Sequence, residues 1–450
     1  MMRAADSPLL TDLYQLTMMQ AYLEHGMCDT AVFEFFARKL SEARGFLVFA
    51  GLEQALQYLE TLHFSEDELA WLVACGRFSR DFVDYLEDIS FDGDVHAMAE
   101  GTIFFPDEPV LRVTAPMPVA QLVESRLINI LQFQTLIASK AARIKLAAPD
   151  KLLVDFGLRR THEAEAGLMA ARASFIAGLS GTSTVLAAPV LDIPIFGTMA
   201  HSFVLAHESE EQAFIDFART HPTNVVLLID TFDTERGAEK VVKIAPQLAV
   251  EGIAIKGVRL DSGDMANHAR KVRKILDDGG LSKTTIFASG NLDEYELKRM
   301  AEMGAPIDGF GVGTRMNTSS DAPYLDCAYK LQEYAGIPRR KTSEGKATWP
   351  GRKQVYRRYE NGEMARDVLT LEDDTQEGKA LINKVMESGE MLTPYPTLAT
   401  IREHAAAELD SLSSHFRNLE TKPAYSAEVS ETLRTLVQEV DARLIGNLNK

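Results

Sequence analysis

The stretch that decides the fold begins at residue 151 and reads KLLVDFGLRR (151–160). In it a short apolar run, Leu152–Val154, ends in the carboxylate of Asp155, and a segment with helical patterning follows. The same unit recurs along the chain at intervals of roughly 20 to 35 residues, which is the period of a strand–helix unit. The later apolar runs are Ser174–Ala177, Ile193–Phe196, Val225–Ile229, Ile253–Val258, Thr285–Ala288 and Ile307–Val312.

This alternation predicts an α/β fold with a parallel sheet that helices cover on both faces. Expected helices lie at Glu208–Thr220, Ala238–Leu248 and Glu294–Glu302. An open doubly wound sheet and a closed barrel both fit the alternation. About seven units, most of them ending in a polar residue or a glycine, favour an irregular TIM-like α/β barrel. Its strand ends would then meet at one mouth.

The regions on either side of this pattern are different in character. We expect an N-terminal α+β domain at 1–140, the barrel at 141–335, and a C-terminal region at 336–450 that packs on the other two. Parts of the C-terminal region are expected to complete the α+β domain. The elements expected outside the barrel are a helix that begins near Thr11, a strand at Ala31–Ala37, and helices at Gln121–Ala142, Thr397–Leu419 and Ala427–Leu444.

Composition excludes several classes of protein. The 450 residues are 46% hydrophobic and 25% charged, which is a globular balance and excludes wholesale disorder, collagen and coiled coil. With 47 basic and 65 acidic residues the net charge is −18, so nucleic acid is not an expected partner. The apolar runs are too short to cross a bilayer, and the N-terminus has no apolar signal core. Cys28, Cys75 and Cys327 form neither a zinc quartet nor a disulfide framework, so we expect a cytoplasmic protein.

The end of the first run combines an aromatic residue with two cations. Arg159 and Arg160 each offer a bidentate fork that suits a carboxylate or a phosphate. Phe156 can stack on a flat ring. Alternatively, the two arginines form a surface pair with Glu163 and Glu165.

The next two strand ends offer hydroxyls and one histidine. The segment Gly181-Thr182-Ser183-Thr184 presents backbone N–H groups and hydroxyls, although a plain turn is an equally good reading. In Gly197-Thr198-Met199-Ala200-His201-Ser202, the histidine is a candidate acid–base group or nucleophile. A lone histidine is more often structural.

The densest polar cluster follows the run at Ile253. In Arg259-Leu260-Asp261-Ser262-Gly263-Asp264 the arginine can face an anion, while Asp261 can bind sugar hydroxyls or support Mg²⁺. Asp230 and Asp233, one strand earlier, are candidates to complete a cation site. The alternative is a simple turn, because Asp, Ser and Gly are turn residues.

Two glycine turns follow the last two strands, and such turns often bind phosphate in barrels. They are Ser289-Gly290-Asn291 and Gly311-Val312-Gly313-Thr314-Arg315. Neither is a Walker loop or a dinucleotide fingerprint. Together, the strand ends predict a site for a phosphorylated sugar with a charged partner molecule.

In order and approximate spacing these motifs resemble those of the nicotinate phosphoribosyltransferase family, and the likeness extends over essentially the whole chain. The resemblance implies a homodimer with shared active sites. It also implies the joining of nicotinate and 5-phosphoribosyl 1-pyrophosphate to give nicotinate mononucleotide and pyrophosphate in NAD salvage. ATP as co-substrate and Mg²⁺ are implied with that reaction. The motifs that resemble the family are Thr11–Met18, Asp155–Arg160, Gly181–Thr184, Gly197–Ser202, Arg259–Asp264, Ser289-Gly290 and Gly311–Thr314.

The resemblance also implies roles for single residues. Phe156 is similar to a ring-stacking aromatic, and Tyr14 of the neighbouring subunit would close the other face of the ring. Arg259, with Arg159 or Arg160, is similar to the groups that bind the substrate carboxylate and phosphates.

Further roles concern the sugar and ATP. Asp261 resembles a ribose ligand, and Asp230 a neighbour of the metal or pyrophosphate. His201 resembles the histidine that ATP phosphorylates transiently. Thr182 and Ser183 are expected to contact the substrate. The residues implied as the 5′-phosphate site are Ser289, Gly290, Gly311, Gly313 and Thr314.

Ser183 bears on the choice of substrate. In the similar nicotinamide enzyme an aspartate stands at this place and accepts from the amide, whereas a serine can donate to a carboxylate. The sequence therefore favours the acid over the amide. Quinolinate phosphoribosyltransferase is the alternative enzyme, for which we expect a richer Lys/Arg cluster and a shorter chain. A non-catalytic barrel that senses a phosphorylated ligand is the third reading, and His201 with Arg259 and Asp261 argues against it.

Overall fold

The computed structural model describes residues 7–420 and 425–448. The chain forms two compact units: Lys140–Pro323 is one, and Met1–Ser139 together with Tyr324–Lys450 is the other. The expected boundary at 140 agrees with this division. The expected boundary at 335 does not, because β12 (Asp326–Tyr334) pairs along its length with β1 (Thr30–Lys39) of the N-terminal region.

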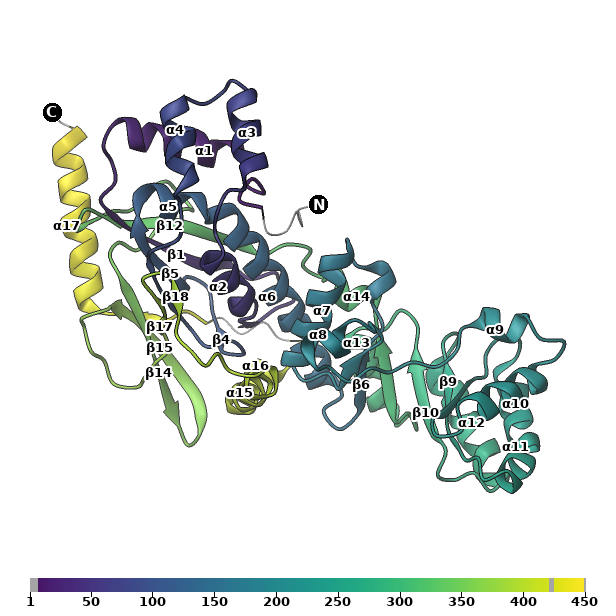
Figure 1. The fold of residues 1–450 in the computed structure, drawn as a ribbon. Coiled ribbons are helices and arrows are strands. Elements are labelled where there is room, and N and C mark those ends of the chain that lie inside the picture. Colours follow the sequence, from purple (N-terminus) through teal and green to yellow (C-terminus); the bar gives the residue numbers. More distant parts are fainter. Residues whose placement is uncertain (1–6, 421–424, 449–450) are drawn as a thin grey trace. The chain divides into compact units, whose positions relative to one another are not determined.

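A curled sheet of six parallel strands forms the centre of the unit Lys140–Pro323 (Figure 1). The strand order is β7-β6-β11-β10-β9-β8. The last strand of the unit in sequence, β11, therefore pairs with the first, β6. This pairing curls the sheet as in a closed barrel. The two edge strands, β7 and β8, are not paired with each other. The sheet is thus a barrel with one open seam. The strands are β6 (Leu152–Asp155), β7 (Gly181–Thr182), β8 (Val225–Leu228), β9 (Ile255–Leu260), β10 (Thr285–Ser289) and β11 (Gly309–Val312).

Two expected strands are wrong or reduced. The run Ser174–Ala177 belongs to the helix α7 (Ala164–Ile176), because a four-residue apolar run does not distinguish a buried strand from a buried helix face. The strand follows it at Gly181, where an added Cβ would lie 2.2 Å from the carbonyl oxygen of Pro194. The run Ile193–Phe196 contributes only a parallel bridge between Ile195 and Thr182.

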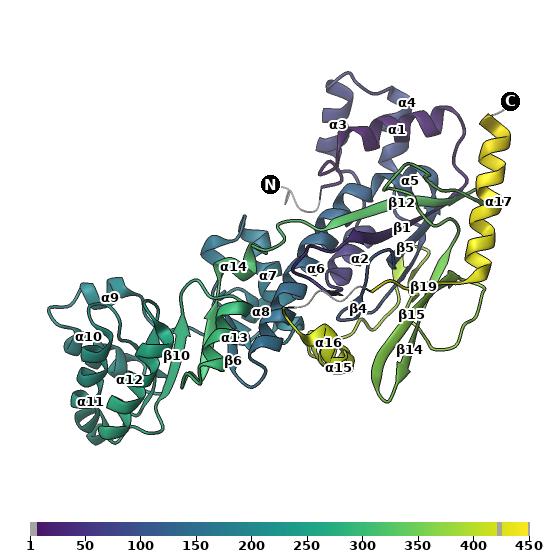
Figure 2. The ribbon, with the colours of Figure 1, turned by 180° about the vertical axis from the view of Figure 1, so that it is seen from behind.

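Helices α10, α11 and α12 cover the outer side of β8, β9 and β10 (Figures 1 and 2). Helices α11, α12 and α13 each begin with an aspartate cap shortly after a strand: Asp233, Asp264 and Asp293 accept backbone N–H groups of the helix that follows. Asp233 is therefore a helix cap. The helices and short turns of this unit are η2 (Leu158–Arg160), α7, α8 (Ala187–Leu191), α9 (His201–Leu205), α10 (Glu210–Thr220), α11 (Thr234–Val250), α12 (Met265–Asp278), α13 (Glu294–Glu302) and α14 (Thr314–Asn317).

The second unit contains a seven-stranded sheet in the order β13-β12-β1-β5-β3-β17-β18 and a four-stranded sheet in the order β16-β14-β15-β19. Its α+β character is as expected. Its remaining strands are β2 (Leu47–Val48), β3 (Asp94–Ala97), β4 (Ile103–Phe104), β5 (Pro109–Pro116), β13 (Ile337–Pro338), β14 (Lys353–Glu360), β15 (Glu363–Leu371), β16 (Lys379–Ala380), β17 (Asn383–Glu387), β18 (Glu390–Met391) and β19 (Glu428–Val429).

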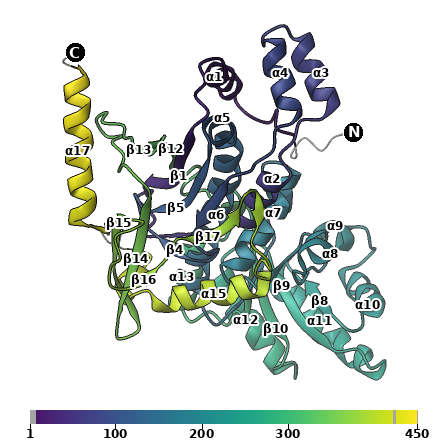
Figure 3. The same ribbon diagram turned by 60° about the vertical axis from the view of Figure 1, so that its left-hand side comes forward.

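The helices of this unit include the expected N-terminal one, and Figure 3 shows α17 standing next to β14 and β15. The first expected terminal helix is shorter than predicted, because Leu412 is extended and ends it; the second begins at Glu431, after β19. None of the described helices is long and apolar enough to cross a membrane. The helices are α1 (Leu13–Glu24), α2 (Leu52–Glu60), α3 (Glu66–Ala74), α4 (Arg80–Glu87), α5 (Met117–Leu122), α6 (Glu124–Ala147, which runs on into the other unit), α15 (Leu398–Ser411), α16 (Ser414–Arg417) and α17 (Glu431–Leu448).

The core of this second unit contains buried charges, each with a partner. Lys353 is 3% exposed, and its Nζ lies 2.8 Å from a carboxylate oxygen of the fully buried Glu34. Burial lowers the pKa of Lys353, and the charge of Glu34 opposes that shift. Arg357 pairs in the same way with Asp367 at 2.7 Å and Glu408 at 2.8 Å. Two cations of the basic stretch 339–358, Lys353 and Arg357, are thus held in buried structural ion pairs.

Candidate active site

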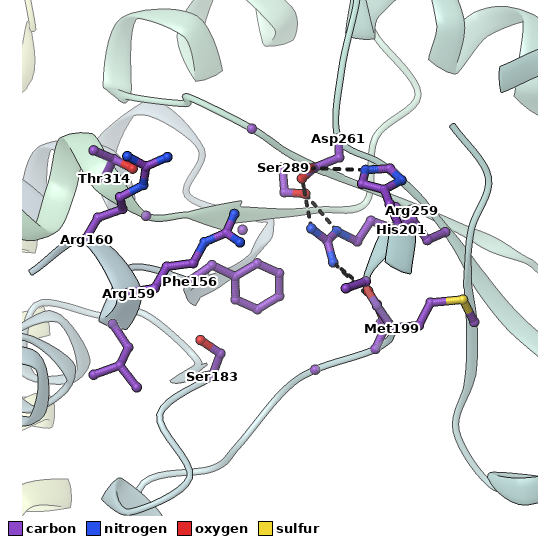
Figure 4. A pocket seen from close by; sticks show the side chains of 18 of the residues that line it. Phe156, Arg159, Arg160, Ser183, Met199, His201, Arg259, Asp261, Ser289 and Thr314 are labelled. Atoms are coloured by element: carbon purple, nitrogen blue, oxygen red, sulfur yellow. Dashed lines mark hydrogen bonds and ion pairs between the residues drawn. The ribbon is translucent and has the colours of Figure 1, made fainter. Parts of the chain in front are cut away.

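One cavity of about 420 Å³ opens among the strand ends and turns of the curled sheet, within the size range of small-molecule sites. Figure 4 shows the Phe156 ring near its centre, with Ser183 on one side and a linked group of Arg259, Asp261 and Ser289 on the other. Twelve residues expected from the sequence line it: Phe156, Arg159, Arg160, Ser183, His201, Arg259, Asp261, Ser289, Gly290, Gly311, Gly313 and Thr314.

Arg259, near the end of β9, connects three segments of the cavity wall. Its Nε donates to Ser289 Oγ at 2.8 Å, and one terminal nitrogen donates to Asp261 Oδ1 at 2.8 Å. The other terminal nitrogen reaches the carbonyl oxygen of Met199 at 3.3 Å. The guanidinium carbon also lies 5.4 Å from the centroid of the Phe156 ring, a cation–π contact. The orientation of Arg259 is thus fixed before any ligand binds.

Asp261 remains a carboxylate in this setting. Burial by itself would raise its pKa, but hydrogen bonds from Ser289 and Arg259, with the charges of Arg259 and His201, hold the pKa of Asp261 below its ordinary value. A carboxylate that is held ionised and oriented is a good acceptor for sugar hydroxyls. Its second oxygen, Oδ2, lies 3.8 Å from His201 Nε2.

His201 is the first residue of the short helix α9, at the seam of the sheet. Its Nδ1 lies 3.1 Å from the hydroxyl of Thr231, and its Nε2 faces Asp261. About 40% of the side chain is exposed, so the ring is anchored through Nδ1 and is open to a reactant from solvent. Such a histidine can accept a group on nitrogen.

Arg159 and Arg160 differ from Arg259 because neither guanidinium has a partner among the described residues. Both are exposed residues of η2, and the alternative pairing with Glu163 and Glu165 is not present. With Arg259 and Asp261 they give the cavity a formal charge of 3 − 1 = +2, in a chain whose net charge is −18. The cavity therefore attracts anions that the rest of the surface repels.

The aromatic wall depends on a glycine in the neighbouring strand. Phe156 follows β6, and a Cβ at Gly311 would lie 2.4 Å from a carbon of its ring. The absence of a side chain at Gly311 thus lets the ring lie flat over β11. Phe287 packs near the same ring, with a centroid distance of 5.7 Å. The phosphate role that the resemblance implies for Gly311 stays a prediction; in the structure this glycine makes room for the aromatic ring.

The two glycine turns offer free donors to the cavity. The backbone N–H groups of Gly290, Asn291, Gly313 and Thr314 have no acceptor among the residues that the structure describes. The first helical turn of α13 is already occupied, because Asp293 Oδ1 accepts from its backbone N–H groups. An anion would therefore meet the turns themselves.

The side chains of Thr182 and Ser183 point in opposite directions, because successive residues of an extended chain face opposite sides. Ser183 lines the cavity, and its hydroxyl has no partner among the described residues. Thr182 is fully buried below the cavity, and its hydroxyl donates to Asp155 Oδ2 at 2.7 Å. Burial raises the pKa of Asp155, and the hydrogen bonds from Thr182 and Gly157 oppose this shift without cancelling it. Thr182 thus supports the site from beneath without facing a ligand.

Asp230 lies behind the cavity wall. Its Oδ2 accepts from the backbone N–H of Asp261 at 3.0 Å and from Ser262 Oγ at 2.6 Å, so it orients the loop that bears Asp261. The described residues contain no group of three or more His, Cys, Asp or Glu that would hold a metal ion. The donor set fits a Mg²⁺ ion held mainly by ligand phosphates and water, with Asp261 or Asp230 adding a carboxylate.

Tyr14 belongs to the other unit. It lies in α1 with 46% of its surface exposed, and burial of part of the ring raises the pKa of its hydroxyl. The role expected for it in a neighbouring subunit stays a prediction.

Among the lining residues to which the sequence assigned no individual role, three contribute visibly to the cavity wall. Thr198 and Met199 form the wall opposite Asp261, with the carbonyl oxygen of Met199 accepting from Arg259. Asn291 lines the turn after β10 with a left-handed backbone, φ 53°. The neighbouring glycines, Gly197 and Gly290, indicate a turn at each place. A backbone carbonyl that accepts a hydrogen bond, however, cannot be recognised from the residue type.

The fold and the cavity define a class: an α/β half-barrel protein whose strand ends present arginines, a carboxylate and free amide groups to an anionic small molecule. A model of the nicotinate phosphoribosyltransferase family matches residues 152–337, and models of that family's N-terminal and C-terminal domains match residues 9–132 and 375–437.

Known proteins agree with these models. The nicotinate phosphoribosyltransferase pncB2 of Mycobacterium tuberculosis is 44% identical over 427 residues, which cover 94% of this chain and 92% of the relative. The nicotinate phosphoribosyltransferase of Bacillus subtilis is 36% identical, with 94% and 93% covered. The crystal structure of human nicotinic acid phosphoribosyltransferase matches with a TM-score of 0.87 and 27% identity, over 96% of this chain and all of that one. The chain belongs to the nicotinate phosphoribosyltransferase family.

Proposed function

We propose that this protein joins nicotinate to 5-phosphoribosyl 1-pyrophosphate, giving nicotinate mononucleotide and pyrophosphate in the salvage route to NAD. The observation that best supports this proposal is the composition of the cavity. It unites free arginines, free turn N–H groups, an oriented carboxylate and an aromatic face in a family member. Each of these matches one part of the two substrates.

The pyridine ring would lie on Phe156, with its carboxylate near the free hydroxyl of Ser183 and the guanidinium of Arg159 or Arg160. A neutral donor and a cation both favour a carboxylate over an amide. The Phe156 ring is held in place by Gly311 and Phe287. Tyr14 of a second subunit would cover the other face of the pyridine, so we propose a homodimer with shared sites.

The sugar would lie between Asp261 and the glycine turns. Asp261 would accept from ribose hydroxyls, and the N–H groups of Gly290, Asn291, Gly313 and Thr314 would surround the 5′-phosphate. The diphosphate would enter as its Mg²⁺ complex, with Arg259 and one of the two free arginines compensating its charge.

In the reaction the ring nitrogen of nicotinate forms a bond to C1 of the ribose, while the bond from C1 to the pyrophosphate oxygen breaks. The electron pair of the broken bond leaves with pyrophosphate, and no proton has to be removed from nicotinate. The protein therefore contributes placement and charge stabilisation of an oxocarbenium-like state. This mechanism therefore requires no dedicated base.

We also propose that ATP hydrolysis is coupled to the reaction through His201. Transfer of the γ-phosphoryl group from ATP to a ring nitrogen would release ADP and place negative charge beside Asp261, Thr231 and Arg259. Arg259 contacts Met199, two residues before His201, so a change at the histidine would be felt by the arginine. Hydrolysis of the phosphohistidine would complete the cycle.

Pyrophosphate release is the test. The purified protein is assayed with nicotinate, nicotinamide and quinolinate, each with 5-phosphoribosyl 1-pyrophosphate and Mg²⁺, with and without ATP. We expect nicotinate to be the preferred substrate and ATP to stimulate turnover. Preference for quinolinate or nicotinamide would contradict the substrate assignment. Full ATP stimulation in a His201→Ala variant would contradict the coupling role alone.

A further inference from the structure

Arg315, the second residue of α14, joins the two glycine turns of the cavity although it does not line the cavity itself. It directly follows the turn Gly313-Thr314. Its Nε donates to Asn291 Oδ1 at 3.1 Å, and a terminal nitrogen forms an ion pair with Asp293. One planar guanidinium therefore contacts two residues of the segment between β10 and α13.

Both partners are residues that set the local backbone. Asn291 has a left-handed conformation, φ 53°, which a non-glycine residue adopts at some cost. Asp293 caps α13 by accepting from the N–H groups of Tyr295 at 3.1 Å and Glu296 at 3.0 Å. Arg315 thus stabilises the conformation in which the N–H groups of Gly290 and Asn291 remain free.

The first residue of α13 is anchored independently. Glu294 is fully buried, and its two oxygens lie 2.9 Å from Arg143 Nε and 2.7 Å from Lys140 Nζ. Lys140 also pairs with Asp321 at 2.9 Å. Because these contacts fix the helix, the turn before it is the segment left for Arg315 to position.

We propose that Arg315 is a positioning residue, which sets the distance between the Gly290-Asn291 turn and the Gly313-Thr314 turn so that their N–H groups converge on one phosphate. This rests on the proposed function, in which that phosphate is the 5′-phosphate of the sugar. The contact requires a fork: a lysine places one ammonium and cannot hold the amide oxygen of Asn291 and the carboxylate of Asp293 in one plane.

The test compares Arg315→Lys with wild type. We expect the KM for 5-phosphoribosyl 1-pyrophosphate to rise about ten-fold, which is about 1.4 kcal/mol, with the KM for nicotinate changed less than two-fold. Protection against thermal unfolding by inorganic phosphate should weaken in parallel. Asn291→Gly keeps the left-handed backbone but removes the acceptor. Asn291→Gly should also raise the KM for 5-phosphoribosyl 1-pyrophosphate. The variant that carries both substitutions should have a KM no higher than that of the more affected single variant.

Arg299→Ala is the matched control, because Arg299 is also an arginine paired with a carboxylate of α13, Glu296 at 2.8 Å, but lies on the exposed helix surface. It should leave both KM values unchanged. Should Arg315→Lys fold poorly, the Asn291→Gly variant and rescue of Arg315→Ala by added guanidinium provide the same measurement.

The outcomes separate the two proposals. An active wild type whose KM for the sugar diphosphate is unmoved by Arg315→Lys and Asn291→Gly overturns the role of Arg315 alone. An equal loss for both substrates, tracking a fall in Tm, would mean that Arg315 is merely structural and also overturns it. A wild type without phosphoribosyl transfer and without stabilisation by phosphate overturns the proposed function, and this inference with it.

Discussion

Replacing Arg259 by lysine is the sharpest test of the site, because it keeps the charge and removes only the fork. Arg259 donates hydrogen bonds to Ser289, Asp261 and Met199 and a longer one, at 3.5 Å, to Thr198, and its side chain is 16% exposed. A lysine ammonium can replace one of them. Hydrogen bonds that involve a charged group contribute about 1.5–3 kcal/mol each.

Loss of two such bonds, partly offset by water, should cost the oriented cavity about 3 kcal/mol. That corresponds to a fall in kcat/KM on the order of a hundredfold. The assay is initial-rate release of pyrophosphate over a matrix of both substrates. Asp261 loses its fixed partner, so the loss should appear mainly in kcat and not in the KM for nicotinate.

Arg219→Lys is the control, since Arg219 donates by the same fork to Glu251, at 2.9 and 2.6 Å, far along the chain on α10 and at the surface. We expect no measurable change in kcat/KM for that variant. If Arg259→Lys retains activity within three-fold of wild type while folding normally, the fixed guanidinium is not what organises the cavity, and the reasoning fails.

Three further predictions follow from single contacts. Ser183→Asp places a carboxylate where the acid of nicotinate is expected; at 4 Å two like charges repel by about 4 kcal/mol. Its kcat/KM for nicotinate should therefore fall at least a hundredfold and that for nicotinamide should not, and equal losses would refute the placement. Glu34→Gln leaves the buried Lys353 without a counter-charge and should lower the free energy of unfolding by about 3–5 kcal/mol in urea titrations; a loss below about 1 kcal/mol would contradict the pairing. Because the pKa of Asp261 is lowered in the folded state, its ionisation stabilises the fold at pH values above its ordinary pKa of about 3.9, and that contribution is lost as pH falls through the folded pKa. The Tm difference between wild type and Asp261→Asn should accordingly shrink below about pH 4, and a difference independent of pH would argue against a depressed pKa.

Strand-end chemistry was predictable from the sequence because a parallel sheet brings the carboxyl ends of its strands to one edge. That rule alone places Phe156, Arg259 and Ser289 at one cavity. It does not say which way a residue faces when the strand is only two residues long. Thr182 was therefore placed in the cavity with Ser183, although the strand geometry directs it into the core beside Asp155.

Other features depend on contacts between distant segments, which a local pattern does not contain. The run Ser174–Ala177 has the composition of a buried strand, and only its packing as the last turn of α7 makes it a helix. The pairing of β12 with β1 joins residues about 300 positions apart and moved the domain boundary. The protein partners of Arg259 belong to the same category: the motif predicted an arginine at the site, but not that most of its donors are already in use.

The unpaired edges of the curled sheet have a consequence for the segment that bears His201. The strands from β6 through β11 and β10 to β9 are each hydrogen-bonded on both sides, whereas the chain between Ile195 and Val225 crosses the open seam without forming a strand. His201 lies on that crossing. The position of this histidine therefore depends on side-chain contacts with Thr231 and Asp261 and not on a strand ladder.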